Sequence, residues 1–227
     1  MMDIDNKYGA LEYQKTTLEM MKDAHRFFAD NGIVYSLTGG SLLGAVRENG
    51  FIPWDDDIDI MMDRNNFEKF LSICERFDNY VVSRMLWEYR IQRKCDYNGS
   101  LTSPTIDITI MDKTPKSVVL NRIKVFIIKA LQGMLHKRVR YNGLSLAHKI
   151  SLFFTFYFGK LFTNEFKFKI YDWVSQFGKN STSNYLGIYD TLFKYLSYTY
   201  KGNTMEAVSL HMFEDAFFVL PTNMMHF

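Results

Sequence analysis

Residues 37–62, LTGGSLLGAVRENGFIPWDDDIDIMM, carry the pattern that decides the fold. A short β-rich run, Ile33–Leu37, meets a glycine pair, Gly39-Gly40, and Ser41–Arg47 then has the composition of a short helix. After a turn signal, Ile58–Met62 alternates hydrophobic and acidic residues as a half-buried strand does. The stretch therefore predicts a strand, a tight turn, a helix and a second strand that begins with acids.

The flanking sequence extends this pattern in both directions. Leu11–Asn31 and Arg64–Phe77 have apolar residues at helical spacing and predict two helices. Further strands are predicted at residues 80–83, 86–91 and 105–111. We therefore expect an α+β fold with a mixed α/β sheet in residues 1–112, the catalytic core. Residues 113–227 are expected to form a basic helical subdomain and a C-terminal segment that pack on this core.

Composition restricts the class of protein. The chain has 227 residues, of which 47% are hydrophobic and 16% aromatic, and this excludes a disordered protein. Cys74 and Cys95 are too few to hold a metal cluster and are expected to be reduced thiols. The polar N-terminus has no signal core, and no run of ~18 uncharged apolar residues occurs. The expected location is cytoplasmic.

Three acids are the candidate metal ligands and catalytic residues. Asp57 and Asp59 fall on one face of a strand, and like charges held side by side usually need a cation between them. Carboxylate oxygens favour Mg²⁺ or Mn²⁺. Asp107 stands alone in a β-branched run and could complete a three-carboxylate site. The alternatives are a solvated acidic loop and an outward-facing strand acid.

The candidate phosphate-binding residues are Gly39, Gly40, Ser41 and Arg47. Two glycines permit close backbone approach, and a helix start offers free N–H groups to an anion. Arg47 could reach a phosphate with its planar fork. The alternatives are an ordinary turn and a surface arginine. For Trp54, packing of the acidic loop is favoured over a cation–π contact with choline.

Taken together, Gly-Gly-Ser, Asp-x-Asp and a distant strand aspartate resemble the nucleotidyltransferase fold typified by polymerase beta. More narrowly, residues 40–47 and 50–59 resemble the signature of the LicD family, and Ile106-Asp107-Ile108 and Asp112 match its second block. That family comprises phosphocholine transferases of bacterial surface glycans and is similar to fukutin and the fukutin-related ribitol-phosphate transferases. Members usually continue beyond the Val219–Pro221 position into a Tyr-Gly-Asp segment, whereas this chain stops at Phe227. Either the sequence is cut or this member is short.

The resemblance implies a CDP-alcohol donor, most directly CDP-choline, and a glycan acceptor that is lipid-linked in some members, such as a precursor of lipopolysaccharide, teichoic acid or capsule. A hydroxyl would attack the phosphorus distal to cytidine and release CMP. Asp57, Asp59 and Asp107 would hold the metal, and Asp107 could also accept the hydroxyl proton. A nucleotidyltransferase that releases pyrophosphate and a non-enzymatic protein with a degenerate site are the alternatives.

Charge is distributed unevenly along the chain. Residues 1–112 carry 19 acidic and 12 basic residues, a net −7, whereas residues 113–179 carry 2 acidic and 13 basic residues, a net +11. The basic segment could contact an anionic membrane peripherally, bind an anionic polymer, or simply cover the sheet with its lysines in solvent. Nucleic-acid binding is not expected, because no recognisable module accompanies the basic residues.

Overall fold

The structure is a computed structural model that describes residues 11–97, 103–136, 143, 145–191, 195–196 and 198–222. These residues form two compact units. The first contains the described parts of Met1–Arg84, Glu88–Ile110 and Asn203–Phe227, and the second contains Met85–Trp87 and Met111–Gly202.

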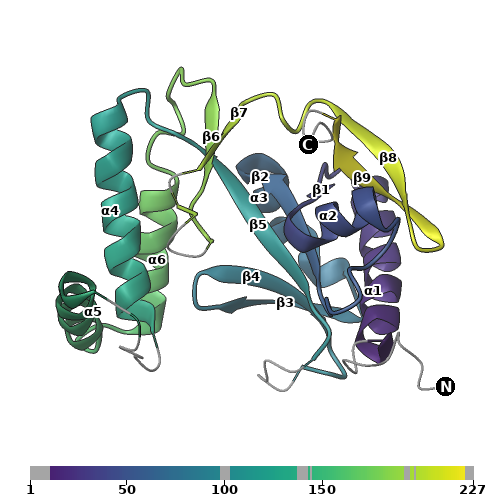
Figure 1. Ribbon diagram of the computed structural model, residues 1–227, viewed down its shortest axis with the longest axis horizontal. Coiled ribbons are helices and arrows are strands. Elements are labelled where there is room, and N and C mark those ends of the chain that lie inside the picture. The colour runs from purple at the N-terminus through teal and green to yellow at the C-terminus, as the bar shows by residue number, and fades with distance from the viewer. Residues whose placement is uncertain are drawn as a thin grey trace. The chain divides into compact units, whose positions relative to one another are not determined.

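Five strands of a seven-stranded sheet form the frame of the first unit, in the order β1-β2-β5-β4-β3 (Figure 1). The strands are β1 (Ser36–Leu37), β2 (Ile58–Asp63), β3 (Tyr80–Met85), β4 (Glu88–Arg93) and β5 (Ile106–Lys113). β1 runs antiparallel to β2, and β4 runs antiparallel to β5. The adjacent strands β2 and β5 carry two of the predicted acids, Asp59 and Asp107.

Helices α1 (Leu11–Asp30) and α3 (Arg64–Ile73) supply apolar side chains to the core of this unit. Met20, Met21, Ala24 and Phe28 follow helical spacing on α1 and are fully buried. They belong to the same core cluster as the isoleucines of β2 and β5, which occupy alternate positions along their strands. Alternation therefore leaves Asp59 and Asp107 on the other face of the sheet.

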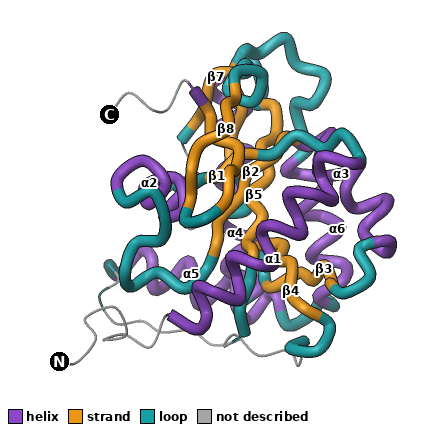
Figure 2. Tube along the Cα trace, turned by 90° about the vertical axis from the view of Figure 1, so that its right-hand side faces the viewer, coloured by secondary structure: helices purple, strands orange, loops and turns teal. Residues whose placement is uncertain are grey.

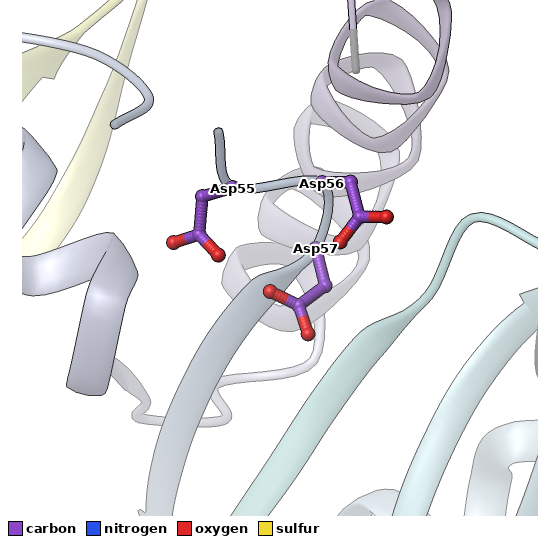
Figure 3. Close-up of side chains that lie close together, drawn as sticks. All are labelled: Asp55, Asp56 and Asp57. Carbon is purple, nitrogen blue, oxygen red and sulfur yellow. The ribbon is translucent and has the colours of Figure 1, made fainter. Parts of the chain in front are cut away.

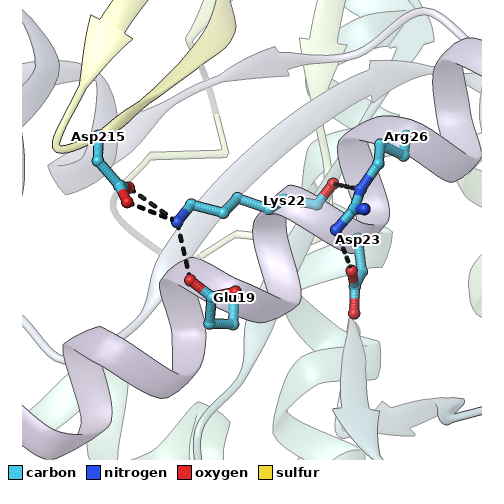
Figure 4. A network of polar contacts seen from close by, with 5 residues as sticks. All are labelled: Glu19, Lys22, Asp23, Arg26 and Asp215. Carbon is cyan, nitrogen blue, oxygen red and sulfur yellow. Dashed lines mark hydrogen bonds and ion pairs between the residues drawn. The ribbon is translucent and has the colours of Figure 1, made fainter.

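The hairpin of β8 (Val208–Phe213) and β9 (Ala216–Pro221) completes the first unit, although it lies far along the chain. Phe213, Phe218 and Leu220 from this hairpin are buried in the same core cluster as α1. At the hairpin turn, Asp215 forms an ion pair of 2.8 Å with Lys22 of α1 (Figure 4). The C-terminal hairpin and the first helix therefore contribute to the same hydrophobic core.

Three helices dominate the second unit: α4 (Val118–Leu135), α5 (Leu146–Gly159) and α6 (Asn164–Ser175). Each begins at a hydroxyl N-cap, namely Ser117, Ser145 and Thr163, whose oxygen accepts a backbone N–H from the first turn. The end of β5 pairs with β6 (Tyr185–Ile188), which pairs with β7 (Thr199–Lys201).

A buried lysine stabilises the interior of the second unit. Lys124 of α4 is 1% exposed, and its Nζ donates to the backbone oxygens of Phe177 at 3.0 Å and Lys113 at 3.3 Å. The same Nζ lies 3.7 Å from the ring centroid of Tyr189. Backbone carbonyls and an aromatic face therefore replace the water that the ammonium group loses on burial.

The predicted α+β class is confirmed, and most predicted elements form. The helix predicted from Ser41 begins at Gly39, and the strand predicted over Ile33–Leu37 is reduced to Ser36–Leu37. The structure also divides the chain differently from the predicted boundary after residue 112. It groups the β8–β9 hairpin with the first unit, because that hairpin fills the first core.

Two further expectations concern thiols and membrane spans. Cys74 and Cys95 are both free thiols, as expected. Within the described residues, no helix is both long enough and apolar enough to cross a membrane.

Candidate metal centre

Three carboxylates from adjacent strands come together on the face of the sheet opposite the α1 core. Asp57 precedes β2, Asp59 is its second residue, and Asp107 is the second residue of β5. One carboxylate oxygen from each residue lies within 4.8 Å of the other two. The structure thus brings together the three acids that strand alternation selects.

Burial and mutual repulsion raise the pKa of each acid in the metal-free protein. Burial, together with the neighbouring Asp57 and Asp107, raises the pKa of Asp59 to about 8. Burial also raises the pKa of Asp107 to about 6, although Arg90 acts against the shift. The pKa of Asp57 is raised as well, by burial and then by Asp56. A divalent cation would remove this repulsion, since each carboxylate is more stable ionised beside a positive charge.

The two carboxylate oxygens of Asp107 differ: one accepts a hydrogen bond and the other has no partner in the described part of the chain. Its Oδ2 accepts from the guanidinium of Arg90 at 2.9 Å, and the two side chains are each 16% exposed. Its Oδ1 is buried and has no hydrogen-bond partner among the described residues. Since a buried oxygen without a partner is costly, this atom is a fitting ligand for a cation. The all-oxygen donor set matches Mg²⁺ or Mn²⁺.

The glycine pair lets α2 (Gly39–Arg47) approach the acids closely. Figure 2 shows α2 beside β1, from which the chain enters the helix through Thr38. Gly39 has φ +54°, and a Cβ there would lie 2.6 Å from Oδ2 of Asp59. A Cβ on Gly40 would likewise meet Oδ2 of Asp55 at 2.4 Å. Only glycine therefore fits at these two positions without displacing a carboxylate.

In this structure the predicted phosphate-binding groups contact the acids themselves. The N–H of Gly40 donates to Oδ2 of Asp59 at 3.3 Å, and the N–H of Asp59 donates to Oγ of Ser41 at 2.8 Å. The start of α2 thus positions Asp59 through both its side chain and its backbone. The positive end of the helix dipole also faces this negative cluster.

Arg47 and Trp54 do not join the cluster. Arg47 ends α2, about 12 Å along the helix axis from Gly39 at ~1.5 Å per residue, and it is exposed. Trp54 is 67% exposed. The preferred expectation that it packs the acidic loop is therefore wrong, because the loop is held by other contacts.

Those contacts come from α1 and the β8–β9 hairpin. Nε2 of Gln14 donates to the backbone oxygen of Asp55 at 2.7 Å, and Oγ1 of Thr17 donates to that of Asp56 at 3.3 Å. The N–H of Phe51 donates to the Glu214 carboxylate at 3.0 Å. These bonds fix the loop by its backbone and leave its carboxylates free to face the site.

Sequence reasoning missed two residues at the site. Arg90 was not selected, although it lies directly opposite Asp107 in the β4–β5 register and forms an ion pair with it. The only sequence feature that could have pointed to Arg90 is a basic residue within a strand whose polar and apolar residues alternate. Asp55 was not selected either, yet its carboxylate faces Gly40, and burial and Asp57 raise its pKa to about 6.

Asp55, Asp56 and Asp57 form a second group of acids with oxygens within 4.8 Å of one another. Figure 3 shows their three carboxylates along the loop that leads into β2. Asp56 is exposed, whereas Asp55 and Asp57 are half-buried. Asp56 is therefore a natural control for substitutions in the cluster.

The fold and this cluster define an α+β protein with a half-buried acidic centre suited to a hard divalent cation. Residues 32–126 match the family model described as LicD/FKTN/FKRP, nucleotidyltransferase domain. In this segment the chain is similar to the LicD family, as the sequence motifs indicated. The matched segment contains β1, α2, the acidic loop, β2 and the Asp107 strand.

Named relatives share this part of the chain. The lipopolysaccharide cholinephosphotransferase LicD of Haemophilus influenzae is 44% identical over 62 residues, which cover 27% of this chain and 23% of that protein. The uncharacterized protein RP689 of Rickettsia prowazekii is 52% identical over 67 residues, which cover 29% of this chain and 25% of the relative. The matched segments thus span about a quarter of each relative's length.

Proposed function

We propose that this protein is a Mg²⁺- or Mn²⁺-dependent transferase with a polymerase-beta-like nucleotidyltransferase core. It moves a phospho-alcohol group, most directly phosphocholine, from a CDP-activated donor to a hydroxyl of a cell-surface glycan and releases CMP. The observation that carries this proposal is the cluster of Asp57, Asp59 and Asp107, with its unpartnered Asp107 oxygen, inside a LicD-family segment.

The choice of phosphocholine rests on a relative. The Haemophilus influenzae protein that matches 62 residues of this chain is named a lipopolysaccharide cholinephosphotransferase. The shared segment includes only part of each protein, so it supports the chemistry of the site more directly than the choice of acceptor.

Asp57, Asp59 and Asp107 would hold the cation, which when bound neutralises charge on the transferred phosphoryl group. Asp107 could also accept the proton of the attacking hydroxyl, since a carboxylate can act as a general base. The acceptor oxygen forms a bond to the distal phosphorus, and the bond from that phosphorus to the CMP oxygen breaks. Arg90 keeps Asp107 oriented through its 2.9 Å contact.

The experiment is a product assay with purified protein, Mg²⁺ and one donor at a time: CDP-choline, CDP-ribitol, CDP-glycerol or a nucleoside triphosphate. A thermal-shift screen of the same donors identifies the ligand that is bound. We expect CDP-choline to raise Tm most and CMP to accumulate. Asp57→Ala and Asp59→Ala should abolish turnover while the fold persists, whereas Asp56→Ala, in the exposed acid of the same loop, should keep it. Full activity in either of the first two variants would contradict the proposal.

Nucleotide transfer is the second candidate, favoured by the description of the matching family as a nucleotidyltransferase domain. It would use the same acids but attack the phosphorus next to the nucleoside. Pyrophosphate in place of CMP as the released product would decide for it.

A further inference from the structure

Helix α5 of the second unit is rich in apolar residues, yet it buries very few of them. Among the residues of α5 whose burial the structure describes, only Gly159 is buried. Leu146 is 75% exposed and Phe154 is 66% exposed. The apolar face of α5 consists of six exposed residues: Leu146, Ile150, Phe153, Phe154, Tyr157 and Phe158. A helix of this composition is normally covered.

These six residues lie on one side of the helix. At ~100° per residue, their spacing confines them to an arc of about 140°. The opposite side of α5 makes the contacts with α4. There a Cβ on Gly133 would lie 2.2 Å from Oγ1 of Thr155, and one on Gly159 would lie 2.6 Å from the backbone oxygen of Met134. Small residues thus let α5 pack closely through one side and present its aromatic side outward.

Lysines accompany this face, and acids do not. Lys149 and Lys160 lie along one edge of the arc at helical spacing, and the sequence of α5 contains no Asp or Glu. Nζ of Lys160 lies 4.6 Å from the ring centroid of Phe156 and 4.8 Å from that of Tyr157. Exposed aromatic rings edged by lysines match the headgroup boundary of an anionic bilayer.

We propose that α5 docks this protein on a lipid surface with anionic headgroups. Charge favours that occupant over a second copy of the chain, because residues 113–179 carry a net +11 and two such segments would repel. The 14 residues of α5 rise only ~21 Å, short of the ~30 Å hydrocarbon core, so the helix lies along the interface. The inference does not depend on the proposed reaction.

The test is co-sedimentation of the full chain with vesicles of phosphatidylcholine alone or of equimolar phosphatidylcholine and phosphatidylglycerol. We expect binding to the anionic vesicles at low salt, weakened by salt. The double variant Leu146→Ser/Phe154→Ser should bind at least about tenfold more weakly, because it removes two large apolar side chains from the contact. Lys149→Gln and Lys160→Gln should each weaken binding about fivefold.

The matched control is Phe217→Ser, at a residue of β9 in the first unit that is 59% exposed. This variant should bind vesicles as the unaltered protein does. Circular dichroism of every variant establishes that the helices persist. Absence of binding to anionic vesicles at low salt would overturn the proposal. So would equal loss in Phe217→Ser, or a self-associated form that the double variant dissolves.

Discussion

Replacing Asp59 by asparagine should stabilise the metal-free protein at about pH 8 and abolish its response to Mg²⁺. Burial and the neighbouring acids raise the pKa of Asp59 from 3.8 to about 8. The folded protein therefore holds this proton more tightly than the unfolded chain does. The stability that comes from the protonated form is fully present below pH 3.8 and is lost as the pH rises through about 8. Asparagine does not ionise and escapes that loss.

The expected magnitude follows from the pKa shift. Each pKa unit corresponds to ~1.4 kcal/mol, so the rise in the pKa of Asp59 from 3.8 to about 8 sets an upper limit of about 6 kcal/mol. Asp55 and Asp107, whose pKa values are about 6, share this repulsion. We therefore expect Asp59→Asn to gain about 2 kcal/mol at about pH 8, or roughly 4–8 °C in Tm. The gain should shrink toward about pH 5, where the folded protein keeps Asp59 protonated.

The assay is thermal unfolding with a chelator at both pH values, repeated with MgCl₂. Mg²⁺ should raise the Tm of the unaltered protein but not that of Asp59→Asn, because a ligand that binds only the folded state stabilises it. Asp56→Asn, at the exposed acid of the same loop, should change stability by less than ~0.5 kcal/mol and keep the Mg²⁺ response. A less stable Asp59→Asn protein at about pH 8, or an undiminished Mg²⁺ response in it, would refute the reasoning.

Two further predictions test the neighbours of the cluster. Arg90→Ala should destabilise the fold by about 2–3 kcal/mol in denaturant unfolding and weaken Mg²⁺ binding in titration, because it leaves the half-buried carboxylate of Asp107 without its partner. Arg90→Lys should recover part of the lost stability and part of the lost Mg²⁺ affinity. An unchanged Mg²⁺ affinity in Arg90→Ala would contradict the role of Arg90 in positioning Asp107. Gly39→Ala, at φ +54°, should cost about 1–2 kcal/mol and abolish turnover, because its Cβ would displace Asp59. Gly143→Ala, at φ +77° with nothing within 4 Å, should carry only the backbone cost and leave turnover intact.

Local patterns predicted most of the first unit. Alternation along β2 and β5 places isoleucines in the core and Asp59 and Asp107 on the other face, and that period can be read from the sequence. The pairing of Arg90 with Asp107 could not be read, because the register between two strands depends on the loop that joins them. The sequence of one strand does not show which residue of the neighbouring strand lies opposite each of its own.

Two further parts of the structure could not be worked out from the sequence, each for a specific reason. Arg47, which is predicted to reach a phosphate, is the last residue of the helix that begins at Gly39, and its role stays a prediction. The C-terminal segment was expected to pack on the core, as it does, but its β8–β9 hairpin was not predicted. Its buried residues, Phe213, Phe218 and Leu220, meet partners almost 200 positions earlier, and no local periodicity encodes such distant contacts.

The late position of this hairpin has a consequence for synthesis on the ribosome. The α1 core needs Phe213, Phe218 and Leu220, but residues 111–202 are translated first. At ~5–20 residues per second, those residues take about 5–20 s to emerge. During that interval the apolar side of α1 and of the sheet has no hairpin to cover it. The second unit, made of contiguous residues apart from three, can fold before the acidic centre gains its final support. A nascent chain paused before residue 208 would therefore expose the surface that chaperones bind.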